Sequence, residues 1–122
     1  MLACVRCVIV DDNEAFLKDA RDLLVREGID VVGLATTLAD ALETIVASRP
    51  ELTLVDIDLQ DESGFDLVRA LDRLPAGHAS RVILISAHAE LDFADLIEAC
   101  SADGFIPKLE LSAGAIDRLL SG

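Results

Sequence analysis

The sequence predicts an α/β domain in which five parallel strands form one sheet with helices on both faces. Short apolar runs alternate with amphipathic helical segments five times along the 122 residues, a (βα)5 pattern. Each connection is long enough for the right-handed crossover that parallel neighbours require. The doubly wound strand order 2-1-3-4-5 places the first and third strands side by side, and such sheets bind ligands where these strands end.

Apolar runs bounded by turn residues define the strands. We expect them at residues 5–10, 29–35, 52–55, 82–86 and 105–106. The run 52–55 reads Leu-Thr-Leu-Val and is followed directly by the carboxylate of Asp56. A run of this length is typical of a parallel strand that is buried on both faces, so Asp56 is the first candidate for chemistry.

Start and stop signals define the helices. They are expected from Asn13 to about Glu27, from Thr37 to before Pro50, from after Gly64 to before Pro75, over residues 90–100, and from Ser112 through Leu120. Thr37 with Asp40 three residues later is a capping-box signature. Gly28 supplies the stop of the first helix.

The composition describes one acidic domain with an aliphatic core. Hydrophobic residues make up 52% of the chain, with four Phe and no Trp or Tyr, and the length suffices for a self-sufficient core. The chain has ten Lys and Arg residues and 23 Asp and Glu residues, which gives a net charge of −13. Phosphate contacts need clustered Lys and Arg, so direct nucleic-acid binding by this domain is not expected.

The sequence carries no signal for a membrane or for secretion. It has no run of 18 apolar residues and no basic N-terminal region followed by a signal-peptide core, so we expect a cytoplasmic protein. Cys4, Cys7 and Cys100 are interpreted as small buried hydrophobic residues in a reducing compartment. No second Cys or His pair is placed to complete a zinc site with Cys4 and Cys7.

Acidic residues follow two of the predicted strands. Asp11 and Asp12 come after the first strand and Asp56 after the third. If these strands are neighbours, the carboxylates share one crevice, and two of them about 5 Å apart repel by roughly 3 kcal/mol at an effective dielectric near 20. Such a cluster holds either protons or a cation, and oxygen ligands without Cys or His favour Mg²⁺ or a similar ion such as Mn²⁺. Three more acids are expected close by: Asp58, Asp61 and Glu62.

Five dispersed positions give the whole chain a resemblance to the receiver domain of two-component response regulators. The pair Asp11-Asp12 resembles the metal-binding acids of that family, and Asp56 resembles its phosphoacceptor. Ser86, at the end of the fourth strand, is similar to the switch hydroxyl. Phe105 matches the switch aromatic residue of the family, and Lys108 matches its characteristic lysine. Both residues lie in the segment Asp-Gly-Phe-Ile-Pro-Lys.

The resemblance implies a flavodoxin-like fold and a phosphorelay function. A sensor histidine kinase or a histidine phosphotransfer protein would pass a phosphoryl group to Asp56, with Mg²⁺ held by Asp11, Asp12, Asp56 and the backbone carbonyl of Asp58. Lys108 would contact the phosphoryl oxygens. Ser86 would then move toward the phosphoryl group and Phe105 would turn inward.

The implied output is a change in the face built from the fourth helix, the fifth strand and the last helix. That face would meet a downstream partner or a second copy of the chain. Chemistry would be limited to self-catalysed phosphotransfer and autodephosphorylation. Residues 1–122 are expected to form one receiver domain, and a longer response regulator stays open because the Lys-x-Glu-Leu-Ser segment from Lys108 resembles receivers that precede helix-turn-helix domains.

The chain departs from the family pattern at three positions. Gln60 stands where receivers usually carry proline, and Ser63 stands where they carry aspartate. Lys108 is followed by Leu109 in place of the frequent proline. A cis bond before a non-proline residue costs about 3 kcal/mol, so the cis bond of the family is disfavoured at this position.

Simpler and competing interpretations remain open. Ser86 could be a buried serine that bonds the backbone, and Phe105 could be a core residue as well as a switch. The motif Asp56-Ile57-Asp58 resembles the nucleophile motif of haloacid-dehalogenase-like phosphatases, although those place it near the N-terminus and the acidic pair late. A pseudo-receiver that acts purely as a binding module is the third alternative.

Overall fold

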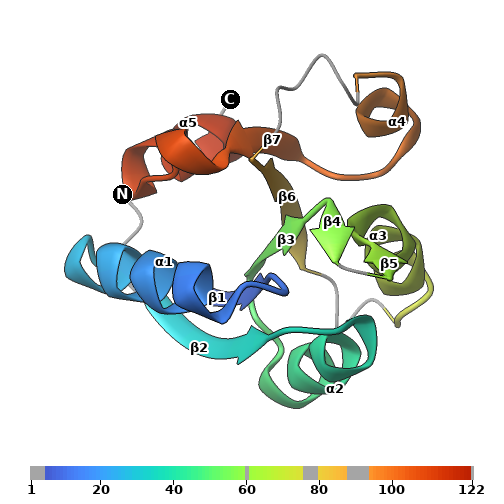
Figure 1. Cartoon of the computed structure of the whole chain (residues 1–122), viewed down its shortest axis with the longest axis horizontal. Coiled ribbons are helices and arrows are strands. Elements are labelled where there is room, and N and C mark those ends of the chain that lie inside the picture. Colours follow the sequence, from blue (N-terminus) through green and yellow to red (C-terminus); the bar gives the residue numbers. More distant parts are fainter. Residues whose placement is uncertain (1–4, 60, 76–79, 88–93, 122) are drawn as a thin grey trace.

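A computed structural model describes residues 5–59, 61–75, 80–87 and 94–121. Five parallel strands form one sheet in the order β2-β1-β3-β6-β7 (Figure 1). These are β1 (Arg6–Val10), β2 (Asp30–Ala35), β3 (Leu52–Asp56), β6 (Arg81–Ser86) and β7 (Gly104–Pro107). Since β6 and β7 are the fourth and fifth strands of this sheet, the predicted order 2-1-3-4-5 is confirmed.

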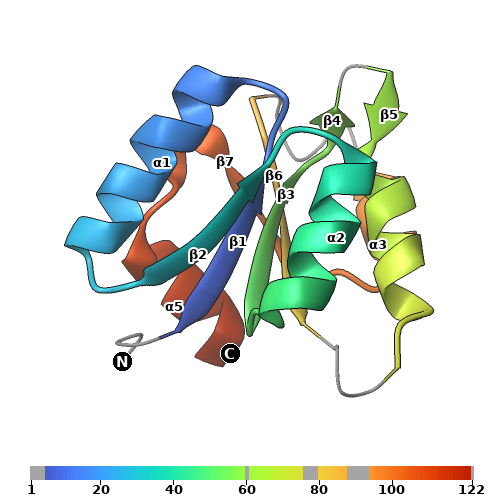
Figure 2. The same ribbon diagram turned by 90° about the horizontal axis from the view of Figure 1, so that it is seen from below.

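Within the described ranges, five α-helices cover the two faces of the sheet. They are α1 (Glu14–Arg26), α2 (Leu38–Ser48), α3 (Gly64–Asp72), α4 (Ala94–Ala99) and α5 (Ala113–Ser121). Helices α1 and α5 lie on one face of the sheet, and α2 and α3 lie on the other (Figure 2). Apolar side chains of α1 and α5 form a core on the first face, and those of α2, α3 and α4 form a second core on the other face. The central strand β3 is buried along its whole length, as a strand between two helical layers must be.

The predicted caps begin the helices. Asn13 Oδ1 accepts from Phe16 N at 3.1 Å, and Thr37 Oγ1 accepts from Asp40 N at 3.1 Å. Ser112 caps α5 through Ala115 N at 3.0 Å. For the predicted helix over residues 90–100 the described part is α4, because residues 90–93 lie outside the described ranges.

Three short elements lie outside the strands and helices that the sequence predicts. The acidic segment after Asp56 folds into an antiparallel hairpin of β4 (Asp58–Leu59) and β5 (Glu62–Ser63). Ser63 then caps α3 through a hydrogen bond from Phe65 N at 3.2 Å, which gives this departure from the family pattern a structural role. A 3-10 turn, η3 (Lys108–Glu110), connects β7 to the last helix.

Across the described ranges no peptide bond is cis, so the bond between Lys108 and Leu109 is trans. Cys7 is free and fully buried, Cys100 is free and half-buried, and Cys4 lies outside the described residues. Among the described helices, none is long and apolar enough to cross a membrane.

Candidate functional site

The strand register brings the predicted acids to one edge of the sheet. In the pairing of β1 with β3, Val10 lies opposite Val55, so Asp11 and Asp56 follow at the same level. One carboxylate oxygen from each of Asp11, Asp12 and Asp56 lies within 4.8 Å of the other two. Asp11 is fully buried and Asp56 is 4% exposed, so this charge is concentrated away from bulk water.

Lys108 reaches the same edge from the end of β7. Its Nζ lies 2.7 Å from Asp11 Oδ2 and 3.1 Å from Asp56 Oδ2. The face of the Phe16 ring is its third neighbour, with the ring centroid 4.5 Å from Nζ. The lysine side chain is 17% exposed, so the ammonium group is partly removed from water.

The backbone holds one oxygen of each buried carboxylate. Asp11 Oδ1 accepts from Asn13 N at 2.8 Å, and Asp56 Oδ1 accepts from Asp58 N at 3.1 Å. Asp11 Oδ2 is buried, and within the described part of the chain it accepts no hydrogen bond of normal geometry, although the Lys108 ammonium lies at ion-pair distance. Lone pairs are therefore directed into the cluster, and an all-oxygen donor set of this kind fits a hard divalent cation such as Mg²⁺.

The pKa values of Asp11, Asp56 and Lys108 reflect an excess of buried negative charge. Burial, together with the charge of Asp11, raises the pKa of Asp56 to about 6, against the lowering influence of Asp58 N–H and Lys108. Burial also raises the pKa of Asp11. Burial alone would lower the pKa of Lys108, but the close contacts of its ammonium group with the negatively charged Asp11 and Asp56 outweigh burial and raise that pKa. One ammonium group thus balances the acids incompletely.

Comparison with known proteins assigns this arrangement to a family. The family description "Response regulator receiver domain" matches residues 7–118. The chain belongs to the response regulator receiver family. Its receiver domain superposes with a TM-score of 0.80 on the signal receiver domain of NarL from Mycobacterium tuberculosis, at 30% identity and with coverage of 98% of this chain and 99% of that one.

Two further relatives resemble this receiver. The activator named DNA-binding transcriptional activator DevR/DosR, from Mycobacterium tuberculosis, is 34% identical over 106 residues, which are 85% of this chain and 48% of DevR/DosR. A response regulator from Burkholderia pseudomallei, solved with a phosphorylated aspartic acid, a calcium ion and citrate, has a TM-score of 0.80 at 25% identity, with coverage of 93% of this chain and 65% of that one. The chain spans about half or less of the curated relatives it matches.

The two predicted switch residues of the receiver lie in or beside its core. Ser86 is 1% exposed and pairs with Pro107 at the end of β6, one residue beyond the level of Asp56. Phe105 is 9% exposed and packs in the core that α2, α3 and α4 cover. The inward position of Phe105 therefore makes it a core residue, which is compatible with a switch role.

The acids of the hairpin do not join the carboxylate cluster. Asp58, Asp61 and Glu62 are exposed, and the group of converging carboxylates found among the described residues omits all three. Glu62 Oε1 instead accepts from Leu38 N at 2.9 Å, so it ties the hairpin to the first turn of α2. These three acids, expected close to the cluster, therefore present exposed side chains outside it, while the backbone of Asp58 touches the cluster through the hydrogen bond from its N–H to Asp56 Oδ1.

Two residues of the site were not identified as such from the sequence. The contact of Phe16 with Lys108 depends on where the end of β7 lies, so the pattern of the first helix does not predict it. Gly64 N donates to Ile57 O at 2.7 Å, and a Cβ on Gly64 would lie 2.2 Å from the backbone oxygen of Asp56. Only glycine fits this approach, which shapes the loop directly after Asp56. The capping role of Glu62, which lies outside the cluster, was also not identified, because a capping acid so far from its helix carries no local sequence signal.

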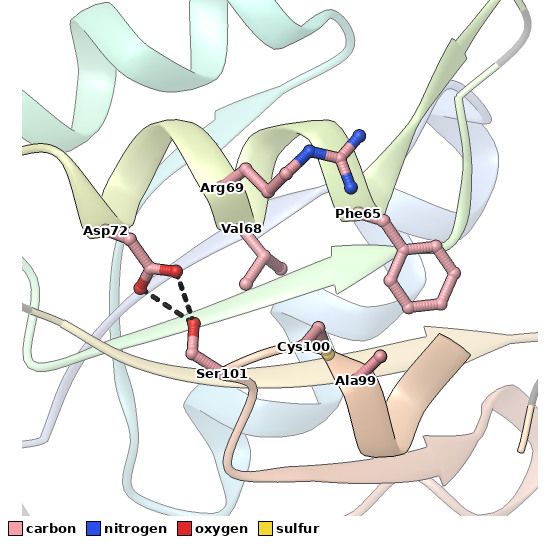
Figure 3. A pocket seen from close by; sticks show the side chains of 7 residues that line it. All are labelled: Phe65, Val68, Arg69, Asp72, Ala99, Cys100 and Ser101. Atoms are coloured by element: carbon pink, nitrogen blue, oxygen red, sulfur yellow. Dashed lines mark hydrogen bonds between the residues drawn. The ribbon is translucent and has the colours of Figure 1, made fainter. Parts of the chain in front are cut away.

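A separate pocket of about 350 Å³ lies between α3 and the end of α4 (Figure 3). Its lining residues are Phe65, Val68, Arg69, Asp72, Ala99, Cys100 and Ser101. Ser101 Oγ donates to the Asp72 carboxylate, at 2.7 Å from each oxygen. No predicted site residue lines this pocket, so the acid cluster remains the candidate for chemistry.

Proposed function

We propose that this receiver accepts a phosphoryl group on Asp56 while Asp11, Asp12, Asp56 and the backbone carbonyl of Asp58 hold Mg²⁺. The observation that supports the proposal is the convergence of three carboxylates and Lys108 at one edge of the sheet. When bound, Mg²⁺ supplies positive charge to the phosphoryl oxygens. Mn²⁺ fits the same oxygen ligands.

The residues of the chain divide the chemistry between them. A deprotonated oxygen of Asp56 attacks the phosphorus of the donor, so that the new O–P bond forms as the bond from phosphorus to the donor nitrogen breaks. Lys108 lies 3.1 Å from Asp56 Oδ2 and is placed to contact a phosphoryl oxygen as a point charge. Burial of the site strengthens these electrostatic contacts because competing water is reduced.

The proposed donor is a sensor histidine kinase or a histidine phosphotransfer protein in the cytoplasm. Receivers take phosphoryl groups from histidine kinases, and family membership supports a signalling role for this chain. The proposed output begins when Ser86 bonds the phosphoryl group and Phe105 repacks. The face of α4, β7 and α5 then changes its affinity for a downstream protein, an output domain or a second copy of the chain.

A longer regulator is part of the proposal. DevR/DosR is named as a DNA-binding activator and is about twice as long as the part that matches this chain. We propose that residues 1–122 form one receiver domain that can serve such an output domain. The net charge of −13 favours leaving nucleic-acid contact to another domain.

Incubation with acetyl phosphate and Mg²⁺ tests the phosphoacceptor. Intact mass spectrometry should show one added phosphoryl group on the wild-type chain and none on Asp56→Asn. Asp61→Asn is the matched control, since it removes one carboxylate from the exposed turn of the hairpin and should leave the added mass unchanged. Phosphorylation of Asp56→Asn to the wild-type extent would refute the proposal.

A turnover assay separates this function from a phosphatase of the haloacid-dehalogenase type. The wild-type chain should show no sustained hydrolysis of p-nitrophenyl phosphate, because a receiver keeps the phosphoryl group on its aspartate until slow autodephosphorylation. Linear product formation over many turnovers that depends on Asp56 would favour the phosphatase. Failure to gain any phosphoryl group, with Mg²⁺ binding intact, would favour the pseudo-receiver.

A further inference from the structure

Phe16 is an aromatic residue at the charged site with no role in the proposed chemistry. It is the third residue of α1, and its amide donates to the cap residue Asn13 at 3.1 Å. Its ring centroid lies 4.5 Å from Lys108 Nζ, inside the roughly 6 Å within which an aromatic face attracts an ammonium group. The side chain is half-buried and also packs against the core beneath α1.

Among the described residues, Asp11 and Asp56 are the charged neighbours of the ammonium group, and the attraction that they exert on it changes during the proposed reaction. Asp11 Oδ2 and Asp56 Oδ2 attract Lys108 Nζ at 2.7 Å and 3.1 Å. A divalent cation held at this cluster would weaken that attraction and would repel the ammonium group directly. Phosphorylation then converts Asp56 from a carboxylate into an acyl phosphate. The ring of Phe16 is neutral, so its attraction for Nζ is the same at each stage.

We infer that Phe16 is a positioning residue whose ring face keeps the Lys108 ammonium group at the acid cluster while the attraction from Asp11 and Asp56 changes. The inference rests on the proposed function, because it assigns Phe16 to the phosphoryl transfer at Asp56. A leucine at this position would preserve much of the apolar contact with the core but would lack the negative face of the ring. The aromatic character, rather than the volume, is therefore the property to test.

The test compares the full wild-type chain with Phe16→Leu and Phe16→Tyr. In the metal-free protein, the ring should shift the proton resonances of the Lys108 side chain upfield in wild type and in Phe16→Tyr, and the shift should be lost in Phe16→Leu. With acetyl phosphate and saturating Mg²⁺, Phe16→Leu should be phosphorylated about three- to tenfold more slowly, in line with the strength of a partly desolvated cation–π contact. Phe16→Tyr should restore a rate close to that of wild type.

The outcomes distinguish this inference from the proposed function. A wild-type chain that gains no phosphoryl group on Asp56 defeats the proposed function, while the resonance shifts still decide whether the ring faces the ammonium group. If wild type is phosphorylated and Phe16→Leu reacts at the same rate, the positioning role is overturned. Equal slowing in Phe16→Leu and Phe16→Tyr also overturns it, because loss of core packing would then explain both rates. Thermal unfolding of each variant confirms that the compared proteins are folded.

Discussion

Asp56 is a carboxylate held in surroundings that favour its protonated form. Burial and the neighbouring charge of Asp11 raise its pKa to about 6 from the ordinary value of 3.8, which applies to the unfolded chain. Between these values the folded state keeps a proton that the unfolded chain releases. The protonated Asp56 therefore stabilises the folded state fully below about pH 4, and this stabilisation is lost as the pH rises through about 6. Near neutral pH the ionised Asp56 destabilises the metal-free domain.

Replacing this carboxylate should stabilise the metal-free domain at neutral pH. We expect Asp56→Asn to raise the free energy of unfolding by about 1–3 kcal/mol near pH 7.5, because a shift of about two pKa units sets the upper end of this range. The gain should shrink near pH 5. Urea unfolding in the presence of a chelator at both pH values measures it, and an equal gain at both would contradict the assigned cause.

Gly64 links the site to the packing of the elements around it. The chain leaves β3, forms the β4–β5 hairpin and returns so closely that Gly64 N bonds Ile57 O at 2.7 Å. A Cβ at Gly64 would lie 2.2 Å from the Asp56 backbone oxygen. Backbone atoms at the end of a buried strand cannot move aside without displacing the phosphoacceptor candidate itself.

Two glycine substitutions of the same kind should have opposite effects. Gly64→Ala should lower the free energy of unfolding by about 1–3 kcal/mol through overpacking and should slow phosphorylation by acetyl phosphate. Gly114→Ala, within α5, meets no atom closer than 3.8 Å and should raise stability by about 0.5–1 kcal/mol. Urea unfolding of both variants provides the comparison. An unaffected Gly64→Ala protein would show that the loop after Asp56 adopts another path.

Folding of the whole chain assembles the acid cluster, so ligand binding and stability are linked. Asp11 follows β1, Asp56 ends β3 and Lys108 follows β7, so these neighbours in the folded chain are far apart in the unfolded one. A cation that binds this cluster binds the folded state and hardly binds the unfolded one. Its binding free energy is then added to the stability of the fold.

Magnesium should stabilise the domain in a manner that depends on pH. At a concentration ten times the dissociation constant, Mg²⁺ should add about 1.4 kcal/mol to the free energy of unfolding, and sodium chloride of equal ionic strength should not. The apparent affinity should weaken as the pH falls through about 6, since protons compete for Asp56. Melting curves over a magnesium titration measure both effects. Equal stabilisation of Asp11→Asn would place the ion elsewhere.

Local patterns in the sequence determined the elements of this protein and the identity of its acids. Apolar runs and caps such as Asn13 and Thr37 depend on neighbouring residues, and strict alternation of strands and helices leaves few topologies. The strand order and the presence of acids after β1 and β3 therefore followed without coordinates. The resemblance to receivers then supplied roles for Ser86, Phe105 and Lys108.

Tertiary structure alone decided which of these groups meet and which additional residues hold them. The hairpin turned Glu62 away from the cluster and onto α2, and the end of β7 placed Lys108 over Phe16. The close return of Gly64 against Asp56 likewise depends on the path of the loop. These contacts depend on register and side-chain packing between elements distant in sequence, and the periodicity of a single helix or strand carries no information about such distances.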